Sequence, residues 1–316
     1  MQIILEILYK LLKVSIMTDV IICGSGPAGM SAALYLKRAN LDILIIEKGT
    51  PGGKLISTAL IENYPGYIEN TGIDLAMIMY RQVKRFKIPY VFSEVVQIEK
   101  VENEHFIVHT KNGDYESKRV IWAAGTIAKS LDAEGEQEFI GRGISYCAIC
   151  DGSFHENQNV VVIGGGNSAL EEAIYLAKIC KKVTIITRGH QFRADSVLLE
   201  KAKNSGKVDF ITHHEVIKFE GENLLEQITM RDKDTKELSV IKVKGAFIYI
   251  GFIPSSTILE NFDVLNDEKY IVVDRNCETK IKGLYAAGDC IDKTIRQIAT
   301  AVADGISCAS AIIKRV

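Results

Sequence analysis

Short apolar runs that end at glycine alternate with amphipathic segments, a pattern typical of buried strands alternating with helices. The mostly apolar run 19–23 stops at Gly24, as expected of a strand buried on both faces. An amphipathic segment at 28–38 predicts a helix, and the apolar run 42–47 predicts a second strand. This β-α-β order within about 30 residues predicts half of a dinucleotide-binding domain.

The same order of elements returns 140 residues downstream, measured from Gly24 to Gly164. Residues 159–163 predict a strand, 168–179 a helix and 182–187 another strand. The repeat therefore predicts a second nucleotide-binding domain of the same kind.

Turn residues, rather than a linker rich in proline, glycine or serine, mark the two places where the chain crosses between the domains. These places are 123–126 and 251–254, and an apolar helix is expected from about residue 296 onward. The most economical fold is α/β, with two Rossmann-like domains and the second inserted into the first. We expect an N-terminal extension at 1–16, a first domain formed by 17–126 and 253–316, and an inserted domain at 127–252.

Composition excludes several classes of protein. A chain of 316 residues is long enough for two domains, and a formal net charge of −2 with no basic stripe argues against nucleic-acid binding. Seven cysteines are too few for a secreted disulfide framework and favour the cytoplasm. Five of them lie among apolar or small residues and are expected to be buried free thiols: Cys23, Cys180, Cys277, Cys290 and Cys308.

The first 16 residues are apolar but contain Glu6, Lys10 and Lys13, so they are too short and too charged to span a membrane. They also lack the features of a signal peptide. Three interpretations compete: translation that in fact begins at Met17, a packed helical arm, or an interfacial helix.

The first glycine-rich loop has the context that phosphate binding requires. Gly24, Gly26 and Gly29 lie between a predicted strand and a predicted helix, where a pyrophosphate can approach the helix N-terminus. Glu47 ends the second strand, where an acid can accept hydrogen bonds from a ribose diol. The alternative is a glycine-rich turn with no ligand.

The second loop begins at Gly164 and has Ala169 at its last glycine position. The strand after its helix leads not to an acid but to a segment containing Arg188 and Arg193. Guanidinium groups there favour a ribose that carries a 2′-phosphate. The alternative is that both arginines merely solvate a loop.

Cys147 and Cys150 are spaced to close a small disulfide and reopen as a dithiol, which carries two electrons. Asp151 follows them, where a carboxylate can move protons as the thiols form and break. A zinc site is the rival, but no second cysteine pair has ligand spacing. The two adjacent histidines at 213–214 are isolated in sequence from other potential metal ligands and are interpreted as a solvated strand edge. No metal is therefore expected. With two nucleotide loops, the pair indicates a pyridine-nucleotide disulfide reductase that uses a flavin.

The chain resembles the bacterial-type (low-molecular-weight) thioredoxin reductases over essentially all of residues 17–316. The matching segments are GSGPAG, PGGKL with IENYPGY, YCAICDG, GGGNSALEEA, the FRA that follows Arg188, and YAAGDC with RQIATA.

This resemblance implies two cofactors and a role for each cysteine. It implies FAD bound by Gly24, Gly26, Pro27, Ala28, Gly29, Glu47, Gly52, Gly53, Lys54, Asn63, Gly288, Asp289, Arg296, Gln297 and Ile298. It implies NADPH bound by Gly164, Gly166, Asn167, Ser168, Arg188 and Arg193. Cys150 would then lie against the flavin, Cys147 would attack the partner disulfide, and Asp151 would be the acid/base. A homodimer and a large rotation of the nicotinamide domain are also implied.

The chain departs from the family pattern at two positions. Gly189 stands where the family usually has a second arginine, and Lys54 replaces a glutamine common beside the flavin. A lysine there is expected to raise the flavin's potential, and the missing arginine to narrow the preference for NADPH over NADH.

The hypothesis is therefore a reductase that passes electrons from NADPH through FAD and the Cys147–Cys150 disulfide to thioredoxin, as a cytoplasmic homodimer with no membrane partner. Two rivals share the fold: a flavoprotein reduced by another electron donor, and a small-molecule dithiol oxidase. A rival of another class is a nucleotide-sensing flavoprotein that acts by binding a partner.

Overall fold

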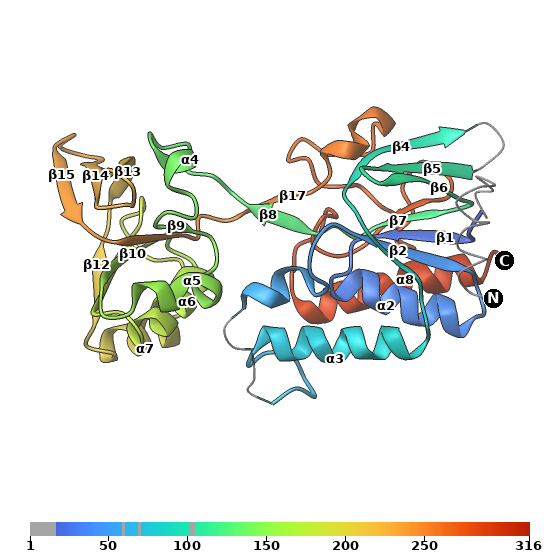
Figure 1. Ribbon diagram of the computed structural model, residues 1–316, viewed down its shortest axis with the longest axis horizontal. Helices are drawn as coiled ribbons and strands as arrows, with labels where there is room; N and C mark the ends of the chain where they lie inside the picture. The colour runs from blue at the N-terminus through green and yellow to red at the C-terminus, as the bar shows by residue number, and fades with distance from the viewer. Residues whose placement is uncertain (1–16, 59–60, 69–70, 102–104) are drawn as a thin grey trace. The chain divides into compact units, whose positions relative to one another are not determined.

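The computed structural model describes residues 17–58, 61–68, 71–101 and 105–316 (Figure 1). The interpretations of the segment 1–16 therefore concern residues outside the described part. The chain divides into two compact units, each considered by itself below. Unit 1 comprises the chain up to Ile56 with Glu62–Thr126 and Pro254–Val316, and unit 2 comprises Ile127–Ile253 with Ser57–Ile61.

Unit 1 is built on a parallel five-stranded sheet in the order β18-β7-β1-β2-β3. The strands are β1 (Val20–Cys23), β2 (Ile43–Glu47), β3 (Tyr90–Phe92), β7 (Val120–Trp122) and β18 (Leu284–Ala286). All four residues of β1 are buried, as both-face burial of a central parallel strand requires. Cys23 pairs with Ile46 of β2 on one side and with Trp122 of β7 on the other, so three strands end together just before Gly24.

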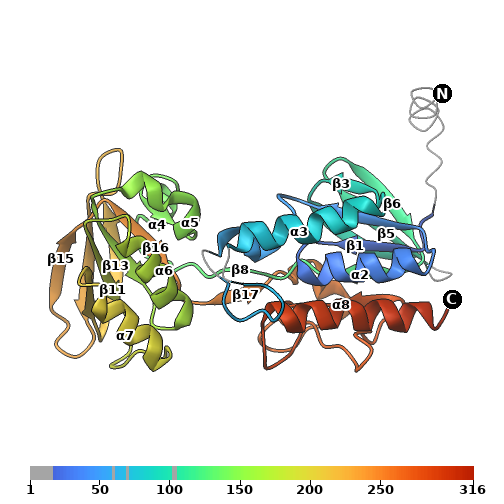
Figure 2. The ribbon, with the colours of Figure 1, turned by 90° about the horizontal axis from the view of Figure 1, so that it is seen from below.

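Helices cover one face of this sheet: α2 (Pro27–Arg38), α3 (Gly72–Arg85) and α8 (Ile298–Ile313). Figure 2 shows α2 and α8 side by side, and their approach depends on Gly305, where a Cβ atom would lie 2.1 Å from the Ala28 carbonyl oxygen. On the other face lies a three-stranded antiparallel sheet, β4 (Val95–Val101), β5 (His105–Thr110) and β6 (Gly113–Ser117). Its buried Ile98, Phe106 and Val108 complete the core against β1 and β7.

Unit 2 repeats this plan around a parallel sheet in the order β12-β11-β10-β16-β9. The strands are β9 (Ile144–Ser145), β10 (Asn159–Ile163), β11 (Lys182–Ile186), β12 (Val208–Ile211) and β16 (Gly245–Ile248). The helical segments are α4 (Glu136–Phe139), α5 (Ala148–Asp151), η2 (Gly152–His155), α6 (Asn167–Ala177) and α7 (Ser196–Asn204). An antiparallel sheet packs on the unit's core: β13 (His214–Glu220), β14 (Gln227–Asp232) and β15 (Leu238–Lys242).

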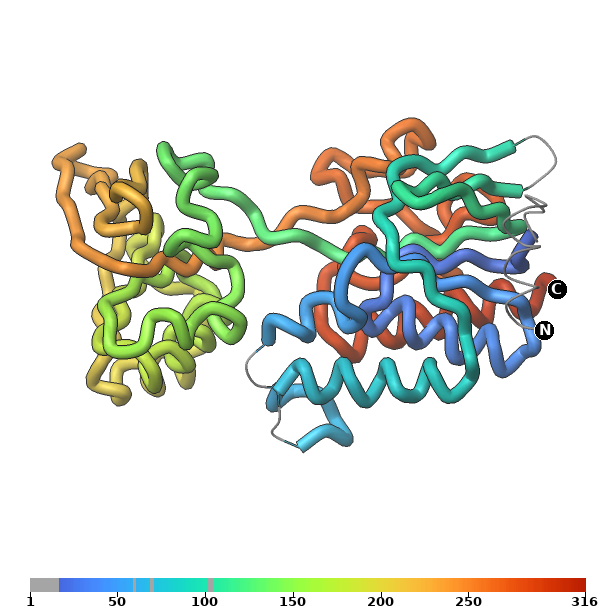
Figure 3. The backbone as a smooth tube through the Cα atoms, viewed as in Figure 1, coloured from blue at the N-terminus to red at the C-terminus, as the bar shows by residue number. Residues whose placement is uncertain are grey.

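Apart from the short segment Ser57–Ile61 that belongs to unit 2, the chain passes between the units at 126–127 and again at 253–254, as the tube in Figure 3 traces. These passages pair as a two-stranded ribbon, β8 (Thr126–Ala128) with β17 (Phe252–Pro254). Unit 1 also contains the 3₁₀ segment η3 (Thr257–Phe262) and all of the 3₁₀ segment η1 (Gly53–Ser57) except its last residue. Among the described residues, no helix has both the length and the apolar character needed to cross a membrane.

The strands and helices expected around both glycine-rich loops are present, with ends that differ by no more than two residues. The two antiparallel sheets and the short helix α5 had no counterpart in the expectations from sequence.

Candidate active site

The first glycine-rich loop has the shape of a phosphate cradle. At Gly24, where φ is +109°, a Cβ atom would lie 2.4 Å from the Ala123 carbonyl oxygen, and at Gly29 a Cβ would lie 2.0 Å from the Gly24 carbonyl oxygen. At Gly26 a Cβ would meet nothing within 4 Å. Gly26 is also the N-cap of α2, with no side chain accepting from the helix. The first and last glycines thus permit close packing, and the middle one leaves the helix N-terminus open to an anion.

Glu47, at the end of β2, stands beside this loop. The Ser25 N–H donates to its Oε2 at 2.7 Å, and the Gly49 N–H donates to its Oε1 at 2.8 Å. These bonds hold the carboxylate at the mouth of the loop. Each carboxylate oxygen has a second lone pair, so Glu47 can still accept from a ribose diol.

Segments distant in sequence converge on the first loop within unit 1. The Gly52 N–H donates to the Ser25 carbonyl oxygen at 2.7 Å, and a Cβ at Gly53 would lie 3.4 Å from the Gly26 Cα. A Cβ at Gly288 would lie 3.0 Å from the Ala28 Cβ. The structure therefore brings together three of the sequence segments proposed to bind one cofactor.

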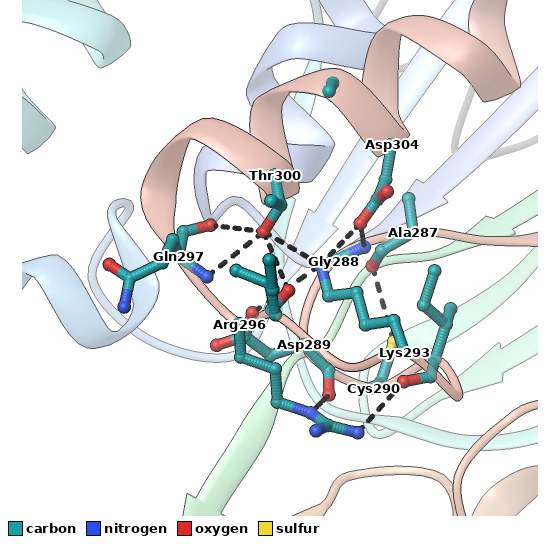
Figure 4. A network of polar contacts seen from close by, with 12 residues as sticks. Ala287, Gly288, Asp289, Cys290, Lys293, Arg296, Gln297, Thr300 and Asp304 are labelled. Atoms are coloured by element: carbon teal, nitrogen blue, oxygen red, sulfur yellow. Dashed lines mark hydrogen bonds and ion pairs between the residues drawn. The ribbon is translucent and has the colours of Figure 1, made fainter. Parts of the chain in front are cut away.

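The segment after β18 contributes a polar network to this site, and Figure 4 shows the part of that network between Ala287 and Asp304. Lys54 Nζ lies 2.5 Å from Asp289 Oδ2, which joins η1 to the segment after β18. Arg296 donates from Nε to the Asp289 carbonyl oxygen at 3.3 Å and stacks its guanidinium 3.9 Å from the centre of the Tyr270 ring. Asn63 Nδ2 donates to Gln297 Oε1 at 3.2 Å, and Ile298 begins α8 immediately after.

Asp289 retains one oxygen for a ligand. Its Oδ1 is buried and has no hydrogen-bond partner within the described residues; Lys293 Nζ lies 3.9 Å from it. A buried oxygen left this way costs free energy until a donor reaches it. A ligand with hydroxyl or N–H donors, such as the ribityl chain and ring of FAD, therefore fits this place together with the open loop at Gly26.

The second glycine-rich loop repeats the cradle in unit 2. A Cβ at Gly164 would lie 2.2 Å from the Tyr249 carbonyl oxygen, and one at Gly165 would lie 2.5 Å from Thr187 Oγ1. At Gly166, the N-cap of α6, a Cβ would meet nothing within 4 Å, and no side chain caps the helix. Ala169 is buried at the position of the last glycine, so this site also fits a dinucleotide phosphate.

The arginine segment after β11 folds back onto the second loop. The Arg193 N–H donates to the Gly165 carbonyl oxygen at 2.7 Å, and the Arg188 and Arg193 side chains are exposed. Asn167 is tied to Asp195 by two bonds, with its Nδ2 donating at 2.8 Å and its Oδ1 accepting from the Asp195 N–H at 2.9 Å. Ser168 is exposed in the first turn of α6. The guanidinium groups are thus free to turn toward a phosphate beside this loop.

The cysteine pair lies at the start of α5 as a disulfide, with Cα atoms 5.3 Å apart. Cys147 is the N-cap of α5, and its Sγ accepts a hydrogen bond from the Cys150 N–H at 3.1 Å. The Cys147 N–H in turn donates to Ser145 Oγ at 2.9 Å. Asp151 is half-buried in the same turn, where its N–H donates to the Cys147 carbonyl oxygen at 3.2 Å. A thiol at this N-cap gains stabilisation of its thiolate from the backbone N–H.

Sequence reasoning missed Tyr249, whose hydroxyl oxygen accepts from the Ala148 N–H at 2.8 Å. It also missed the buried Glu136, which accepts from the Tyr146 hydroxyl at 2.7 Å directly before the redox pair. Tyr249 could have been found from its position directly after β16, because β16 pairs in parallel with β10, the strand that leads to Gly164. Carboxyl ends of parallel strands share an edge, which is where such sites form.

The five remaining cysteines are free and buried, which confirms the expectation from sequence. Burial raises the pKa of Cys290 to about 12 and that of Cys180 to about 11. Thiols with such values stay protonated near neutral pH and are poor nucleophiles.

Comparison with known proteins agrees with this geometry. The family model described as "Pyridine nucleotide-disulphide oxidoreductase" matches residues 18–305. The chain belongs to this family. It is 42% identical to the thioredoxin reductase of Bacillus subtilis (strain 168) over 296 residues, which are 93% of each chain. It is 40% identical to that of Mycoplasma genitalium over 299 residues, covering 94% of this chain and 95% of the relative.

Solved structures of family members give the same result. The Lactococcus lactis thioredoxin reductase, described as in the FR conformation, superposes with a TM-score of 0.90 at 35% identity, covering 95% of this chain and 100% of that one. The T. acidophilum thioredoxin reductase superposes with a TM-score of 0.89 at 34% identity, covering 94% and 98%. The α/β fold with two Rossmann-like domains, one inserted into the other, and the resemblance to thioredoxin reductases are thereby confirmed.

Proposed function

We propose that the chain is a thioredoxin-disulfide reductase that passes electrons from NADPH through FAD and the Cys147–Cys150 disulfide to thioredoxin. The observation that carries this proposal is the disulfide itself, which unit 2 holds together with the Gly164 phosphate cradle. A redox pair and a dinucleotide site in one unit, with a second cradle in the other unit, account for every motif of the sequence. Relatives at 40–42% identity carry the same name.

Unit 1 binds FAD in this account and unit 2 binds NADPH. The Gly24–Gly29 loop would hold the FAD pyrophosphate, Glu47 would accept from a ribose, and Asp289 Oδ1 would accept from the flavin part. The Gly164–Gly166 loop would hold the NADPH pyrophosphate, and Arg188 and Arg193 would bind the 2′-phosphate. When bound, FAD supplies a two-electron relay between NADPH and the disulfide.

The cysteines then carry out a thiol–disulfide exchange. Two electrons and two protons convert the Cys147–Cys150 disulfide into a dithiol. The Cys147 thiolate attacks the thioredoxin disulfide, so that a bond from its Sγ to one thioredoxin sulfur forms and the thioredoxin S–S bond breaks. Cys150 attacks the Cys147 Sγ, which restores the disulfide and releases thioredoxin with both thiols protonated.

Local geometry supports Cys147 as the attacking thiol. Its Sγ accepts the Cys150 N–H at 3.1 Å at the N-cap of α5, which favours the thiolate over the thiol. Asp151, half-buried in the same turn, takes up and returns the proton of the second thiol.

The passages between the units that form the β8–β17 ribbon each follow a glycine suited to a hinge. Gly125 and Gly251 have φ values of +65° and +114°, and a Cβ at either would meet nothing within 4 Å. We propose that unit 2 rotates about hinges near Thr126 and Gly251, so that the nicotinamide and the disulfide alternate at the flavin. Gly251→Ala should lower turnover severalfold. Gly113→Ala is the control, because Gly113 also has a positive φ but lies in the β5–β6 hairpin, and it should leave turnover unchanged. Equal rates in both variants would argue against the hinge.

The proposal includes a cytoplasmic homodimer. Five buried free thiols suit a reducing compartment, and the resemblance to thioredoxin reductases implies the dimer. Sedimentation at micromolar concentration should give twice the mass of 35.0 kDa, and a monomer at that concentration contradicts this part.

A trapping experiment tests the thiol assignment. A thioredoxin variant that keeps only its attacking cysteine is first converted to a mixed disulfide with an aromatic thiol, which is a good leaving group. It is then mixed with each variant of this protein that keeps only one of the two redox cysteines. Cys150→Ser, which leaves Cys147 free, should form the covalent complex quickly, and Cys147→Ser slowly. Cys180→Ser, which removes a buried thiol outside the turn, is the matched control and should retain full thioredoxin reduction. Faster trapping through Cys150 reverses the assignment.

A further inference from the structure

Three potential metal ligands that are far apart in sequence meet in unit 2. His190 lies in the arginine segment after β11, His213 directly before β13, and Asp234 in the turn between β14 and β15. Their ligating atoms all lie within 4.8 Å of one another. The sequence-based interpretation of 213–214 as a solvated strand edge is wrong for His213, because its side chain is only 15% exposed.

The backbone of His213 holds the other two ligands in place. Its N–H donates to the Gly189 carbonyl oxygen at 2.9 Å, and its carbonyl oxygen accepts from the Lys233 N–H at 3.0 Å. Those two partners are the neighbours of His190 and Asp234. His213 itself has a left-handed φ of 60°, a conformation that is costly for a residue with a side chain and persists where its surroundings enforce it.

Both ring nitrogens of His213 are buried, and neither has a hydrogen-bond partner within the described residues. Nε2 lies 2.8 Å from Asp234 Oδ1, close enough for an ion pair but without the alignment of a hydrogen bond. One face of the His213 ring stacks on His190, with centroids 3.7 Å apart and planes 12° from parallel. A buried ring nitrogen without a hydrogen bond costs free energy, and a cation bound between one of these nitrogens and the Asp234 carboxylate removes that cost for the nitrogen that it binds.

We propose that His190, His213 and Asp234 bind one divalent transition-metal ion of the Zn²⁺ class. Two imidazole nitrogens and one carboxylate oxygen are ligands that Zn²⁺ accepts at about 2.0–2.2 Å, with water at the fourth position. The ligating atoms, now within 4.8 Å of one another, can reach the span of a tetrahedral site when the exposed His190 ring turns out of its stack and the exposed Asp234 carboxylate moves slightly away from Nε2. This site shares no residue with the redox disulfide.

Occupation of this site would order the segment that selects the nucleotide. His190 lies between Arg188 and Arg193 in the sequence. Gly189 stands at the position of the missing arginine, and its carbonyl oxygen accepts the hydrogen bond from the His213 N–H. A cation bound there adds positive charge beside the 2′-phosphate position. This coupling rests on the proposed NADPH site, whereas metal binding itself does not.

The first experiment measures metal binding alone. The holoprotein with Cys147→Ser and Cys150→Ser, which removes the redox thiols as ligands, is titrated with Zn²⁺ by calorimetry. One equivalent per chain should bind, and X-ray absorption should show a nitrogen and oxygen shell near about 2.0–2.1 Å with no sulfur shell near about 2.3 Å. His190→Ala and Asp234→Asn, both at exposed positions, should each weaken binding roughly tenfold or more.

His214→Ala is the matched control, because His214 adjoins the site but pairs with Asp232, 3.7 Å away, instead. It should leave Zn²⁺ affinity unchanged. Absence of stoichiometric binding, a sulfur shell, or equal affinity in the His190→Ala and Asp234→Asn variants overturns the metal site.

The second experiment measures the coupling by equilibrium binding of NADP⁺ and NAD⁺ with and without Zn²⁺. Zn²⁺ should tighten NADP⁺ binding severalfold and leave NAD⁺ binding unchanged, and Asp234→Asn should abolish the difference. Zn²⁺ binding with no effect on NADP⁺ overturns the coupling and leaves the metal site intact. If neither nucleotide binds, the proposed function fails while the metal result stands by itself.

Discussion

The Tyr249 hydroxyl oxygen accepts a hydrogen bond from the Ala148 N–H at 2.8 Å, which ties the end of β16 to the turn that holds both redox cysteines. Ala148 is fully buried and begins α5 between Cys147 and Cys150. The Tyr249 carbonyl oxygen also packs against Gly164 of the second phosphate cradle. One residue thus positions the redox turn relative to the proposed nicotinamide site.

Tyr249→Phe should loosen the redox turn without affecting flavin binding. The change leaves the buried Ala148 N–H without its acceptor, which costs about 1–3 kcal/mol. We expect a shifted midpoint potential of the Cys147–Cys150 couple and slower thioredoxin reduction, with unchanged FAD content. Redox titration against a thiol buffer measures the potential, and Tyr175→Phe on α6 is the control. A potential equal to that of the unaltered protein shows that the bond has no positioning role.

The arginine segment should determine nucleotide preference. One hydrogen bond to a charged group contributes about 1.5–3 kcal/mol, roughly tenfold to a hundredfold in affinity. Arg188→Ala should therefore nearly remove the preference for NADPH over NADH in kcat/KM. Gly189→Arg should widen it; a Cβ there would lie 3.1 Å from the Gln191 carbonyl oxygen, so the new side chain needs only a small shift. Unchanged ratios in both variants, with NADH used as well as NADPH, mean that these arginines only solvate a loop.

Acid should destabilise unit 2 through Glu136. Burial alone raises the pKa of this carboxyl, but hydrogen bonds from Tyr146, Leu131, Ser130 and Ala133 outweigh it and hold the pKa below its usual value. A depressed folded-state pKa contributes stability that is present above the unfolded value of about 4.3 and is lost as the pH falls through the folded value.

Chemical unfolding between about pH 6 and pH 3 measures this contribution, across the unfolded glutamate pKa. Glu136→Gln should lower stability at pH 6 and flatten its decline in acid, because the variant has no carboxylate to protonate. Glu138→Gln, at an exposed position two residues away, should reproduce the pH profile of the unaltered protein. A steep decline retained in Glu136→Gln would show that other groups cause it.

Lys54 should set the flavin potential. Its Nζ lies 2.5 Å from Asp289 Oδ2, so its positive charge stands within the proposed FAD site and balances that carboxylate. Lys54→Gln removes the charge and should make the flavin midpoint potential more negative, because the reduced flavin loses a stabilising cation. Lys84→Gln on the exposed face of α3 is the control for net charge. A potential that does not move, or that becomes more positive, contradicts this role.

Much of the site could be predicted from sequence because it depends on backbone geometry. Gly24, Gly29 and Gly164 are required by close approaches that only glycine allows, so their spacing is visible in the chain. The redox pair is likewise local, since Cys147 and Cys150 lie in one turn.

The contacts that could not be predicted are those between side chains on segments far apart in the sequence. Lys54 meets Asp289 and Tyr249 meets Ala148 only because parallel strands end at a common edge. His213 appeared isolated in sequence because the residues that contact it lie on other segments, His190 after β11 and Asp234 between β14 and β15. Periodicity reveals which faces of an element are buried, but it does not reveal which side chains of separate elements touch.

Anaerobic stopped-flow spectroscopy tests the central claim most directly. The protein should be yellow with about one FAD per chain, since unit 1 has one pyrophosphate cradle of this kind. Two equivalents of NADPH should reduce the Cys147–Cys150 disulfide and leave the flavin absorbance bleached, and oxidised thioredoxin from the same organism should then restore the absorbance while gaining two thiols. Cys147→Ser should still bleach but should not reduce thioredoxin. A colourless protein that cannot be reconstituted with FAD, or a bleached flavin that thioredoxin does not reoxidise, contradicts the account.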